Sequence, residues 1–503
     1  MINKNKKIGI VFLLLGIILM GFFTACKKDF FDVNKNPNHP ADVTVDYLLP
    51  SAEAAIAHAV GNNLQIYGGF WAQFWTQSPT SSQYKSLDQY NPASTDFDSP
   101  WKILYADALQ DLQTIIAKGT ATNQMQYVAC AKILEAYTYQ LLTDNWGDVP
   151  FSEALQAQSG NIAPHFDSQK DIYTNIIKMV GDGIALIDSA NSGGPGMPAA
   201  DDILFQGHMD NWKHFANTLK LRMYLRLSEI DPVTGKNGVM ALQSSGAVFL
   251  QSGEDAKIVY TSNGGNTNPI YSSLISLNNV QNFVASSTAV DYMNNNNDNR
   301  QYYLYTPLSN GAVVGLIQGG YNFPYSTPST TVCYPGAAVG GDNRDPNSAT
   351  APVKLMSSYE SFFLQAEAVA RGWMVGDDSA LYIAGITENY MAYVTPVDSV
   401  VSWATAYYSQ PAIAYPTTGT LQDKVKAIIT QKWASMCGNQ NDEAWIESRR
   451  TNYPDFFIKS KNSIIGDSTH MPERLFYPSA EVSNNGNFPG QKLITAKVWW
   501  DAN

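Results

Sequence analysis

The chain has 503 residues, 45% of them hydrophobic and 12% aromatic, and its formal net charge at pH 7 is −12. Such an acidic chain repels phosphate backbones, and no lysine or arginine tract offsets this, so we expect no nucleic acid partner. The length suggests about three domains at the usual domain size. No linker-like segment divides the sequence, however, so we expect a single domain after the N-terminal segment.

The N-terminal segment has the pattern of a bacterial export signal. Three lysines and no acid precede an apolar run over residues 8–23, as in the charged and hydrophobic regions of such a signal. The sequence FTAC at residues 23–26 resembles the bacterial lipobox, in which the cysteine carries the lipid. We therefore predict a cleaved lipoprotein signal over residues 1–25, a lipid anchor at Cys26 and a mature net charge of −15. An uncleaved transmembrane helix is the alternative, although the run is short for a span.

Three further cysteines, Cys130, Cys333 and Cys437, remain after the predicted cleavage. Their odd number, and the absence of a Cys-x-x-Cys motif or a Cys/His cluster, indicate neither a disulfide framework nor a zinc site. Cys130 and Cys437 lie in helix-like apolar sequence, where cysteine acts as a small buried hydrophobic residue.

Helical periodicity recurs along the chain and is interrupted once. Apolar residues spaced three and four apart predict helices over residues 51–67, 101–118, 125–143, 171–187 and 212–223, and again over residues 355–369, 379–393 and 421–437. Residues 232–352 are rich in Gly, Ser, Asn and Thr and contain short strand-like pieces such as residues 256–260, which indicates an irregular, loop-rich lobe. Beyond Trp445 the chain is rich in Pro and Asn, and we expect little regular structure there. The predicted fold is mainly α, with consecutive helical hairpins of the tetratricopeptide kind and minor β structure in the lobe.

Five strings of residues, in order along the chain, resemble the SusD/RagB family of nutrient-binding lipoproteins. They are AKILEAY at residues 131–137 with LTDNWGDVPFSEA at residues 142–154, WKHFANTLKLR at residues 212–222, YESFFLQAEA at residues 359–368, EAWIESRRTNYP at residues 443–454, and PERLFYP at residues 472–478. The resemblance implies one SusD-like domain over residues 26–503, with the irregular lobe inserted between the helical hairpins at about residues 232–352.

The resemblance also implies a function and a place in the cell. A SusD-like protein is anchored by lipid in the outer membrane, faces the cell exterior and binds an oligosaccharide, or less often a peptide. It delivers this ligand to a SusC-like TonB-dependent transporter, which is its protein partner. The group of the family that the strings resemble has no assigned ligand.

The residues of these strings suit structural roles. We expect Asn217 and Arg222 to bond buried backbone carbonyls, and Arg449 and Arg450 to pair with glutamates of residues 443–447. These strings therefore indicate the fold without forming the ligand site.

A saccharide site needs flat aromatic rings beside amides, carboxylates and guanidinium groups, because a sugar has apolar faces and a rim of hydroxyls. Residues 71–90 and the irregular lobe offer this mix, and in the family that the chain resembles ligand contacts come from similar loops. A packing role is the alternative for each aromatic residue, and Asp298-Asn299-Arg300 resembles a structural turn of the family. The candidate ligand-binding residues are Trp75, Gln77, Tyr84, Asp88 and Tyr90 in the first segment, and Tyr271, Tyr292, Arg300, Tyr302, Tyr321 and Tyr325 in the second.

Motifs of the common enzyme classes are missing from the sequence, including the Gly-x-Ser-x-Gly elbow, His-Glu-x-x-His and the Walker loop. We therefore expect no catalytic residues, no cofactor and no metal; the acidic Asp342, Asp345 and Asn347 cluster lacks the EF-hand order. Two alternatives to nutrient binding stay open: a surface glycoside hydrolase that uses two carboxylates, and a structural or adhesion lipoprotein that binds no small ligand.

Overall fold

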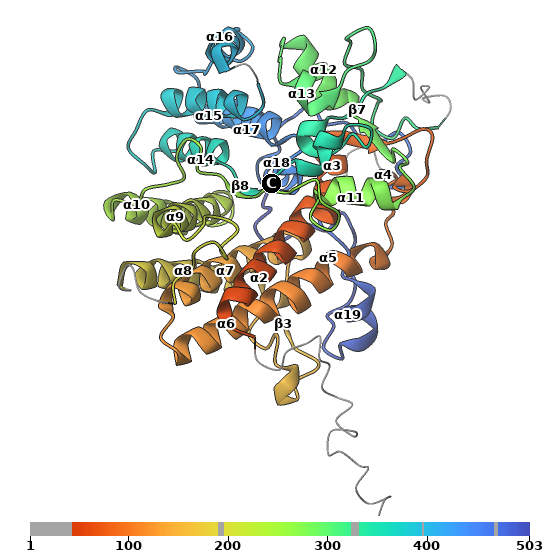
Figure 1. The fold of residues 1–503 in the computed structure, drawn as a ribbon. Coiled ribbons are helices and arrows are strands. Elements are labelled where there is room, and N and C mark those ends of the chain that lie inside the picture. The colour runs from red at the N-terminus through yellow and green to blue at the C-terminus, as the bar shows by residue number, and fades with distance from the viewer. Residues whose placement is uncertain (1–42, 190–195, 323–330, 395–396, 467–470) are drawn as a thin grey trace, which may run out of the picture. The chain divides into compact units, whose positions relative to one another are not determined.

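The structure, a computed structural model, describes residues 43–189, 196–322, 331–394, 397–466 and 471–503. Residues Val45–Asn503 form one compact unit, built mainly of helices with short two-stranded sheets (Figure 1). The predicted mainly α fold is thus confirmed. Within the described ranges, no helix combines the length and the apolar character that a membrane span requires. The predicted signal segment and Cys26 lie outside the described residues, and they stay predictions.

Helices of the N-terminal half pack on one another in chain order. Each of α7, α8, α9 and α10 contacts the helix before it, as expected for consecutive hairpins, and α2 packs across α6 (Figure 1). The bounds are α2 (Val45–Gly61), α3 (Asn63–Trp71), α4 (Lys85–Asp88), α5 (Asp98–Lys102), a π-helical turn η3 (Ile103–Leu109), α6 (Gln110–Ala121), α7 (Met125–Trp146), α8 (Gln169–Ser189), α9 (Met209–Arg226) and α10 (Pro232–Ser244).

The C-terminal half repeats this pattern. Helix α14 packs on α15 and on α17, α15 packs on α16, and α17 packs on α18. A cluster of buried aromatic and aliphatic side chains, including Phe363, Tyr382 and Tyr390, fills the space between these helices. The bounds are α14 (Ser358–Ala370), α15 (Asp378–Tyr393), α16 (Val397–Tyr408), α17 (Leu421–Met436), α18 (Asn441–Thr451) and α19 (Ser479–Asn484).

The irregular lobe lies between the two halves in the sequence, and it begins at a later residue than predicted. Residues 232–244 form α10, which packs on α9 as the second helix of a hairpin. Asp231 caps this helix by accepting a hydrogen bond from the Thr234 backbone N–H at 3.1 Å, and Pro232 follows as its first residue. The glycines of this segment suggested a loop, but the cap and the packing on α9 outweigh their low helix propensity.

The lobe contains short helices and antiparallel strand pairs. Strand β5 pairs with β1, β8 with β4, and β7 with β6, while β2 pairs with β3 in the helical part. The bounds are α11 (Pro269–Ser276), α12 (Ser287–Asn295), α13 (Gln301–Leu304), β1 (Trp75–Gln77), β2 (Val149–Pro150), β3 (Phe166–Asp167), β4 (Ala256–Ile258), β5 (Phe283–Ala285), β6 (Tyr305–Thr306), β7 (Tyr334–Pro335) and β8 (Val353–Met356). Short 3-10 turns cover Ser94–Phe97, Ala157–Ser159, Ala337–Val339 and Pro346–Thr350.

The structure departs from the predicted helices in several places: residues 51–67 are divided between α2 and α3, and α16 was not predicted. The first helix begins at Val45, before Pro50, because Leu48 and Leu49 are buried and their packing outweighs the backbone hydrogen bond that proline removes. Helix α18 continues past Trp445 to Thr451, into the segment predicted to have little regular structure. Its sequence, NDEAWIESRRT, has almost no apolar stripe, yet most of its side chains are buried.

The polar side chains of α18 are buried because they form ion pairs with other helices. Arg226 on α9 lies 2.7 Å from Glu443 and also pairs with Glu447. Arg450 lies 2.7 Å from Glu447 and 2.7 Å from Glu367 on α14. Buried charges are tolerated only when they are paired in this way. The network therefore fixes α18 against α9 and α14.

The expected pairing of the two adjacent arginines is half right. Arg450 pairs with Glu447 as predicted, but Arg449 donates to the backbone carbonyls of Glu473 and Asp144, at 2.6 and 3.0 Å. Consecutive helical residues point about 100° apart. Arg450 therefore faces the ion-pair network while Arg449 faces the C-terminal segment.

Of the two predictions for side chains of α9, one is confirmed and one is wrong. Asn217 donates to the Val248 carbonyl at 2.9 Å, as predicted. Arg222 instead donates to the Gln140 side-chain oxygen at 2.8 Å and lies 3.4 Å from a Glu360 carboxylate oxygen, so the prediction of a backbone partner was wrong. The Glu360 carboxylate offsets the cost of burying the Arg222 charge, which a neutral carbonyl does less well.

Helix α3 crosses α18 at close range, and this crossing needs glycine. A side chain on Gly68 would collide with the backbone nitrogen of Asp442, and one on Gly69 would meet the Trp75 ring. The close approach places Trp71 against Trp445, with ring centroids 4.8 Å apart.

Candidate ligand-binding groove

Tyr292 on α12 forms an aromatic wall together with Phe456, which comes from the C-terminal segment. The two rings are stacked, with centroids 5.3 Å apart and an interplanar angle of 19°. The Tyr292 ring also meets the Trp433 ring edge-on at 5.4 Å, and its hydroxyl accepts a hydrogen bond from the Gln431 amide at 2.6 Å. Contacts on several sides therefore hold the ring in one orientation.

Two cavities, of 490 and 460 Å³, share this wall. Both are lined by Tyr292, Asn296 and Phe456, so we treat them as one feature, the Tyr292 groove. One cavity is also lined by Tyr382, Ala412, Ile413, Ala414, Pro416, Asp423, Lys426, Ala427, Thr430, Gln431 and Asp455, and the other by Ser287, Thr288, Asp291, Asn295, Ile317 and Ile458.

The groove is acidic. Asp291, Asp423 and Asp455 line it with a single lysine, Lys426, which lies 2.5 Å from Asp455. Hydrogen bonds from Thr420, the cap of α17, lower the pKa of Asp423. Partial burial raises the pKa of Asp291. Apolar rings beside amides, hydroxyls and carboxylates provide contacts for both the faces and the hydroxyl rim of a sugar.

Four of the candidate residues from the sequence are fully buried. Trp75 stacks on Phe283 at 4.8 Å. Asp88 accepts hydrogen bonds from the Thr76 hydroxyl at 2.8 Å and from the Gln77 backbone N–H at 3.1 Å. Burial raises the pKa of Asp88 to about 6. A ligand on the surface of this structure does not reach Trp75, Gln77 or Asp88, and these residues stabilise the loop around β1.

Arg300 is the fourth buried candidate. It lies 2.6 Å from Asp298, donates to Asn389 at 2.7 Å, and faces the Tyr390 and Tyr407 rings at 4.9 and 5.1 Å. These contacts join the lobe to α15 and α16 and agree with the structural interpretation of the Asp298-Asn299-Arg300 turn.

The other candidate tyrosines differ in exposure. Tyr302 is 48% exposed, Tyr84 and Tyr271 are half-buried, and Tyr321 is buried beneath the Lys85 ammonium, which lies 5.5 Å above its ring. The Tyr90 hydroxyl accepts from the Ser460 backbone N–H, and this ring lines a separate cavity. Tyr325 lies outside the described residues.

Sequence reasoning missed Phe456 and Phe457, which are half-buried in the C-terminal segment. Two adjacent phenylalanines in a stretch without helical or strand periodicity cannot be explained by an amphipathic element. That mismatch was the available signal, because exposed aromatic residues in a loop often mark a binding surface.

Helical hairpins that carry an inserted lobe with short strand pairs define the SusD-like fold class. A family model described as "Starch-binding associating with outer membrane" matches residues 37–478, and the chain belongs to this SusD-like family. The resemblance inferred from the five strings is thus confirmed. Comparison with curated proteins finds no match.

Solved structures show the same fold. A SusD homolog from Bacteroides uniformis has a TM-score of 0.75 at 22% identity, and the match covers 91% of this chain and 100% of that one. A SusD-like protein from Bacteroides thetaiotaomicron has a TM-score of 0.74 at 22% identity, with 92% and 99% covered. A chitin-binding SusD homolog from Flavobacterium johnsoniae has a TM-score of 0.73 at 21% identity, with 90% and 99% covered.

Proposed function

We propose that this protein is a cell-surface lipoprotein that binds an oligosaccharide in the Tyr292 groove and delivers it to a SusC-like TonB-dependent transporter. The stacked pair of Tyr292 and Phe456 between two adjoining cavities is the observation that carries the proposal. Each cavity falls within the range of about 300–1,000 Å³ that is usual for small-ligand sites. The family description and the chitin-binding relative support a saccharide.

The lipid anchor at Cys26 and the transporter partner follow from the sequence pattern and from membership of the family. A tethered binding protein raises the local concentration of its ligand beside the transporter. The expected observation is co-purification of a large outer-membrane transporter with the protein after mild detergent extraction. A protein that is consistently extracted alone would contradict this part of the proposal.

We propose binding without catalysis. A glycosidase needs one carboxylic acid that holds its proton near neutral pH beside a second, ionised carboxylate. In the groove, Asp455 is paired with Lys426, and the pKa of Asp423 is lowered by Thr420. The hydrogen bonds from Thr420 favour the ionised form of Asp423, and Asp291, the groove acid whose pKa is raised by burial, lines the other cavity. Prolonged incubation with labelled oligosaccharides should give no product, whereas sustained product formation would favour the glycosidase alternative.

Calorimetry with a panel of chito-oligosaccharides, malto-oligosaccharides and short peptides tests the ligand and the site together. We expect saccharide binding that weakens at least tenfold in Phe456→Ala, because this change removes half of the aromatic wall. Tyr47→Ala is the matched control, since it removes a 70% exposed ring on α2 that lines neither cavity and should leave the affinity unchanged. Failure of every saccharide to bind, or equal affinity in Phe456→Ala and the wild type, would contradict the proposal.

A further inference from the structure

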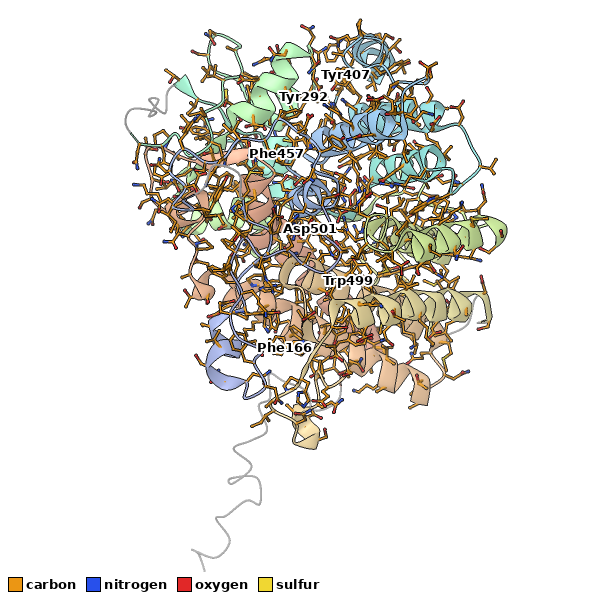
Figure 2. The ribbon with its side chains drawn as sticks, turned by 180° about the vertical axis from the view of Figure 1, so that it is seen from behind. Phe166, Tyr292, Tyr407, Phe457, Trp499 and Asp501 are labelled. Carbon is orange, nitrogen blue, oxygen red and sulfur yellow. The ribbon has the colours of Figure 1, made fainter. Side chains whose placement is uncertain are left out.

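A third cavity, of 260 Å³, lies next to the Tyr292 groove. It shares Asp455 with the groove and is lined by Phe457, the neighbour of Phe456. Figure 2 shows Phe457 between Tyr292 and Asp501 along one face of the molecule. We call this cavity the Arg449 pocket; the argument below uses its lining residues Trp445, Ser448, Arg449, Asp455, Phe457 and Glu473.

The Arg449 guanidinium in this pocket has an unmet hydrogen-bonding need. The side chain is 5% exposed and lies over the Trp445 ring at 3.8 Å. Its two terminal nitrogens donate to backbone carbonyls, but its Nε–H meets no acceptor among the described residues. Buried donors are almost always paired, by protein, water or ligand.

Glu473 presents a second unmet group in the same pocket. Its Oε2 atom is buried and accepts no hydrogen bond from an amide, guanidinium or alcohol group of the described residues. Burial is the main cause that raises the pKa of Glu473, and the nearby Asp501 carboxylate raises it further. Arg449 and Lys497 lower this pKa. Glu473 and Asp501 share a hydrogen bond, so this acidic pair retains a proton more readily than an isolated carboxylate.

The two unmet groups together select a class of ligand. The Arg449 Nε–H needs an acceptor, and the Glu473 carboxyl has enough lone pairs to accept a hydrogen bond from a ligand as well as the one that it shares with Asp501. Sugar hydroxyls satisfy both, because a hydroxyl accepts and donates at the same time. An anionic group fits less well, because the Asp455 and Glu473 carboxyls line the pocket and a third carboxyl, that of Asp501, is hydrogen-bonded to Glu473.

We propose that the Arg449 pocket is a terminal subsite that takes one neutral sugar ring with adjacent hydroxyls, while the rest of the oligosaccharide lies in the Tyr292 groove. The shared Asp455 makes the two features adjoin, and the indole and phenyl rings of Trp445 and Phe457 supply apolar contacts for the ring faces. The pocket has about half the volume of either groove cavity, which suits a single ring. This inference rests on the proposed function and says where one end of the bound oligosaccharide lies.

A substitution that fills the pocket tests the inference. Ser448 is half-buried, and its hydroxyl donates only to the Trp445 carbonyl within α18. Ser448→Leu should occupy the pocket, and Ser448→Ala is the matched control, because it removes the same hydroxyl without filling the space. The probes are chito-oligosaccharides and malto-oligosaccharides from disaccharide to hexasaccharide, measured by calorimetry with each variant.

We expect the wild type to bind the longer chains more tightly, and Ser448→Leu to lose at least tenfold in affinity for them. Disaccharide binding should stay unchanged, and Ser448→Ala should behave as the wild type. Equal effects on short and long chains, or none on either, would overturn the subsite. If Ser448→Leu does not fold, Phe457→Ala makes the same comparison, since it removes one apolar wall of the pocket.

The design separates this inference from the proposed function. Loss of binding in Phe456→Ala together with an unaltered length dependence in Ser448→Leu supports the groove and rejects the subsite. Failure of both probe series to bind the wild type rejects both. A crystal structure with the tightest probe gives the direct result: a sugar ring within hydrogen-bonding distance of Arg449 Nε and Glu473 Oε2 supports the subsite, and an empty pocket beside an occupied groove overturns it.

Discussion

The Arg226 guanidinium on α9 donates to both carboxylate oxygens of Glu443 on α18, at 2.7 and 2.8 Å. The side chains are separated by more than two hundred positions in the sequence and are almost completely buried. Arg226 also pairs with Glu447 and lies 3.3 Å from Asp144. One guanidinium thus neutralises acids from two different helices.

Arg226→Ala should therefore be strongly destabilising. Removing one partner of a buried ion pair leaves uncompensated charge, and we expect the free energy of unfolding to fall by about 3–5 kcal/mol. Chemical denaturation followed by circular dichroism measures this change. Lys213→Ala is the control, because it removes an exposed ion pair with Asp188 and should cost about 0–1 kcal/mol. Equal effects of the two substitutions would contradict the role given to the buried network.

Much of the helical fold could be predicted from the sequence, but the extent of α18 could not. Helices with an apolar stripe, such as α8 and α17, were located to within a few residues, because periodic burial leaves a local signal. Helix α18 is polar on most sides, and its burial depends on acids and bases contributed by α9 and α14. A partner hundreds of positions away leaves no local pattern.

The candidate site was predicted less completely, for a related reason. Tyr292 was chosen for its chemistry and lines the groove, whereas Asp88 and Arg300 were chosen on the same grounds and are buried. Residue type indicates what a side chain can contact, but only tertiary structure decides whether it is accessible. Phe456 reaches Tyr292 from the far end of the chain, so no sequence spacing related the two residues.

Glu135 on α7 should make the stability depend on pH. Burial raises its pKa to about 7, although the Gln113 amide donates to it at 2.6 Å. The folded protein then keeps a proton that the unfolded chain releases, so this group's contribution to stability falls as the pH rises from about 4.5 towards 7. Glu135→Gln keeps a hydrogen-bond acceptor and does not ionise. Its stability relative to the wild type should therefore rise with pH, by up to about 3 kcal/mol.

Thermal or chemical unfolding of the wild type and Glu135→Gln at pH 5, 6, 7 and 8 measures this effect. Asp182→Asn is the control, because this carboxylate is 43% exposed and forms its ion pair with Lys178 on the same helix. It should change the free energy of unfolding by less than about 0.5 kcal/mol. A difference between wild type and Glu135→Gln that is constant from pH 5 to 8 would show that Glu135 is ionised throughout.

Cys26→Ala should release the protein from the membrane. If Cys26 carries the lipid, anchoring comes from acyl chains that contribute about 0.8 kcal/mol for each buried methylene group, and none of it remains without the thiol. Fractionation of cells should find the wild type with the outer membrane and the variant in the soluble fraction. Cys130→Ala is the control, because Cys130 is buried inside α7. Membrane association that persists in Cys26→Ala, in protein whose N-terminus shows that residues 1–25 have been removed, would exclude the lipid as the anchor.

The C-terminal residues should contribute to stability through Trp500. Its indole N–H donates to Asp144 at 2.7 Å, and its ring lies against the guanidinium groups of Arg226 and Arg449, at 5.4 and 5.0 Å. Trp500→Ala removes a fully buried ring and a hydrogen-bond donor to a buried carboxylate. We expect a loss of about 3–5 kcal/mol in the free energy of unfolding.

Leu493→Ala is the matched control for Trp500→Ala, because this side chain belongs to the same segment and is 74% exposed. It should lower the free energy of unfolding by less than about 0.5 kcal/mol. Trp500→Phe separates the two contributions, since it keeps a ring against both arginines but loses the donor to Asp144. If Trp500→Phe is as stable as the wild type, packing alone accounts for the effect; if it is as unstable as Trp500→Ala, the hydrogen bond to Asp144 dominates. No loss in Trp500→Ala would show that this segment is not needed for the fold, because Arg226 and Asp144 then remain compensated by their other partners.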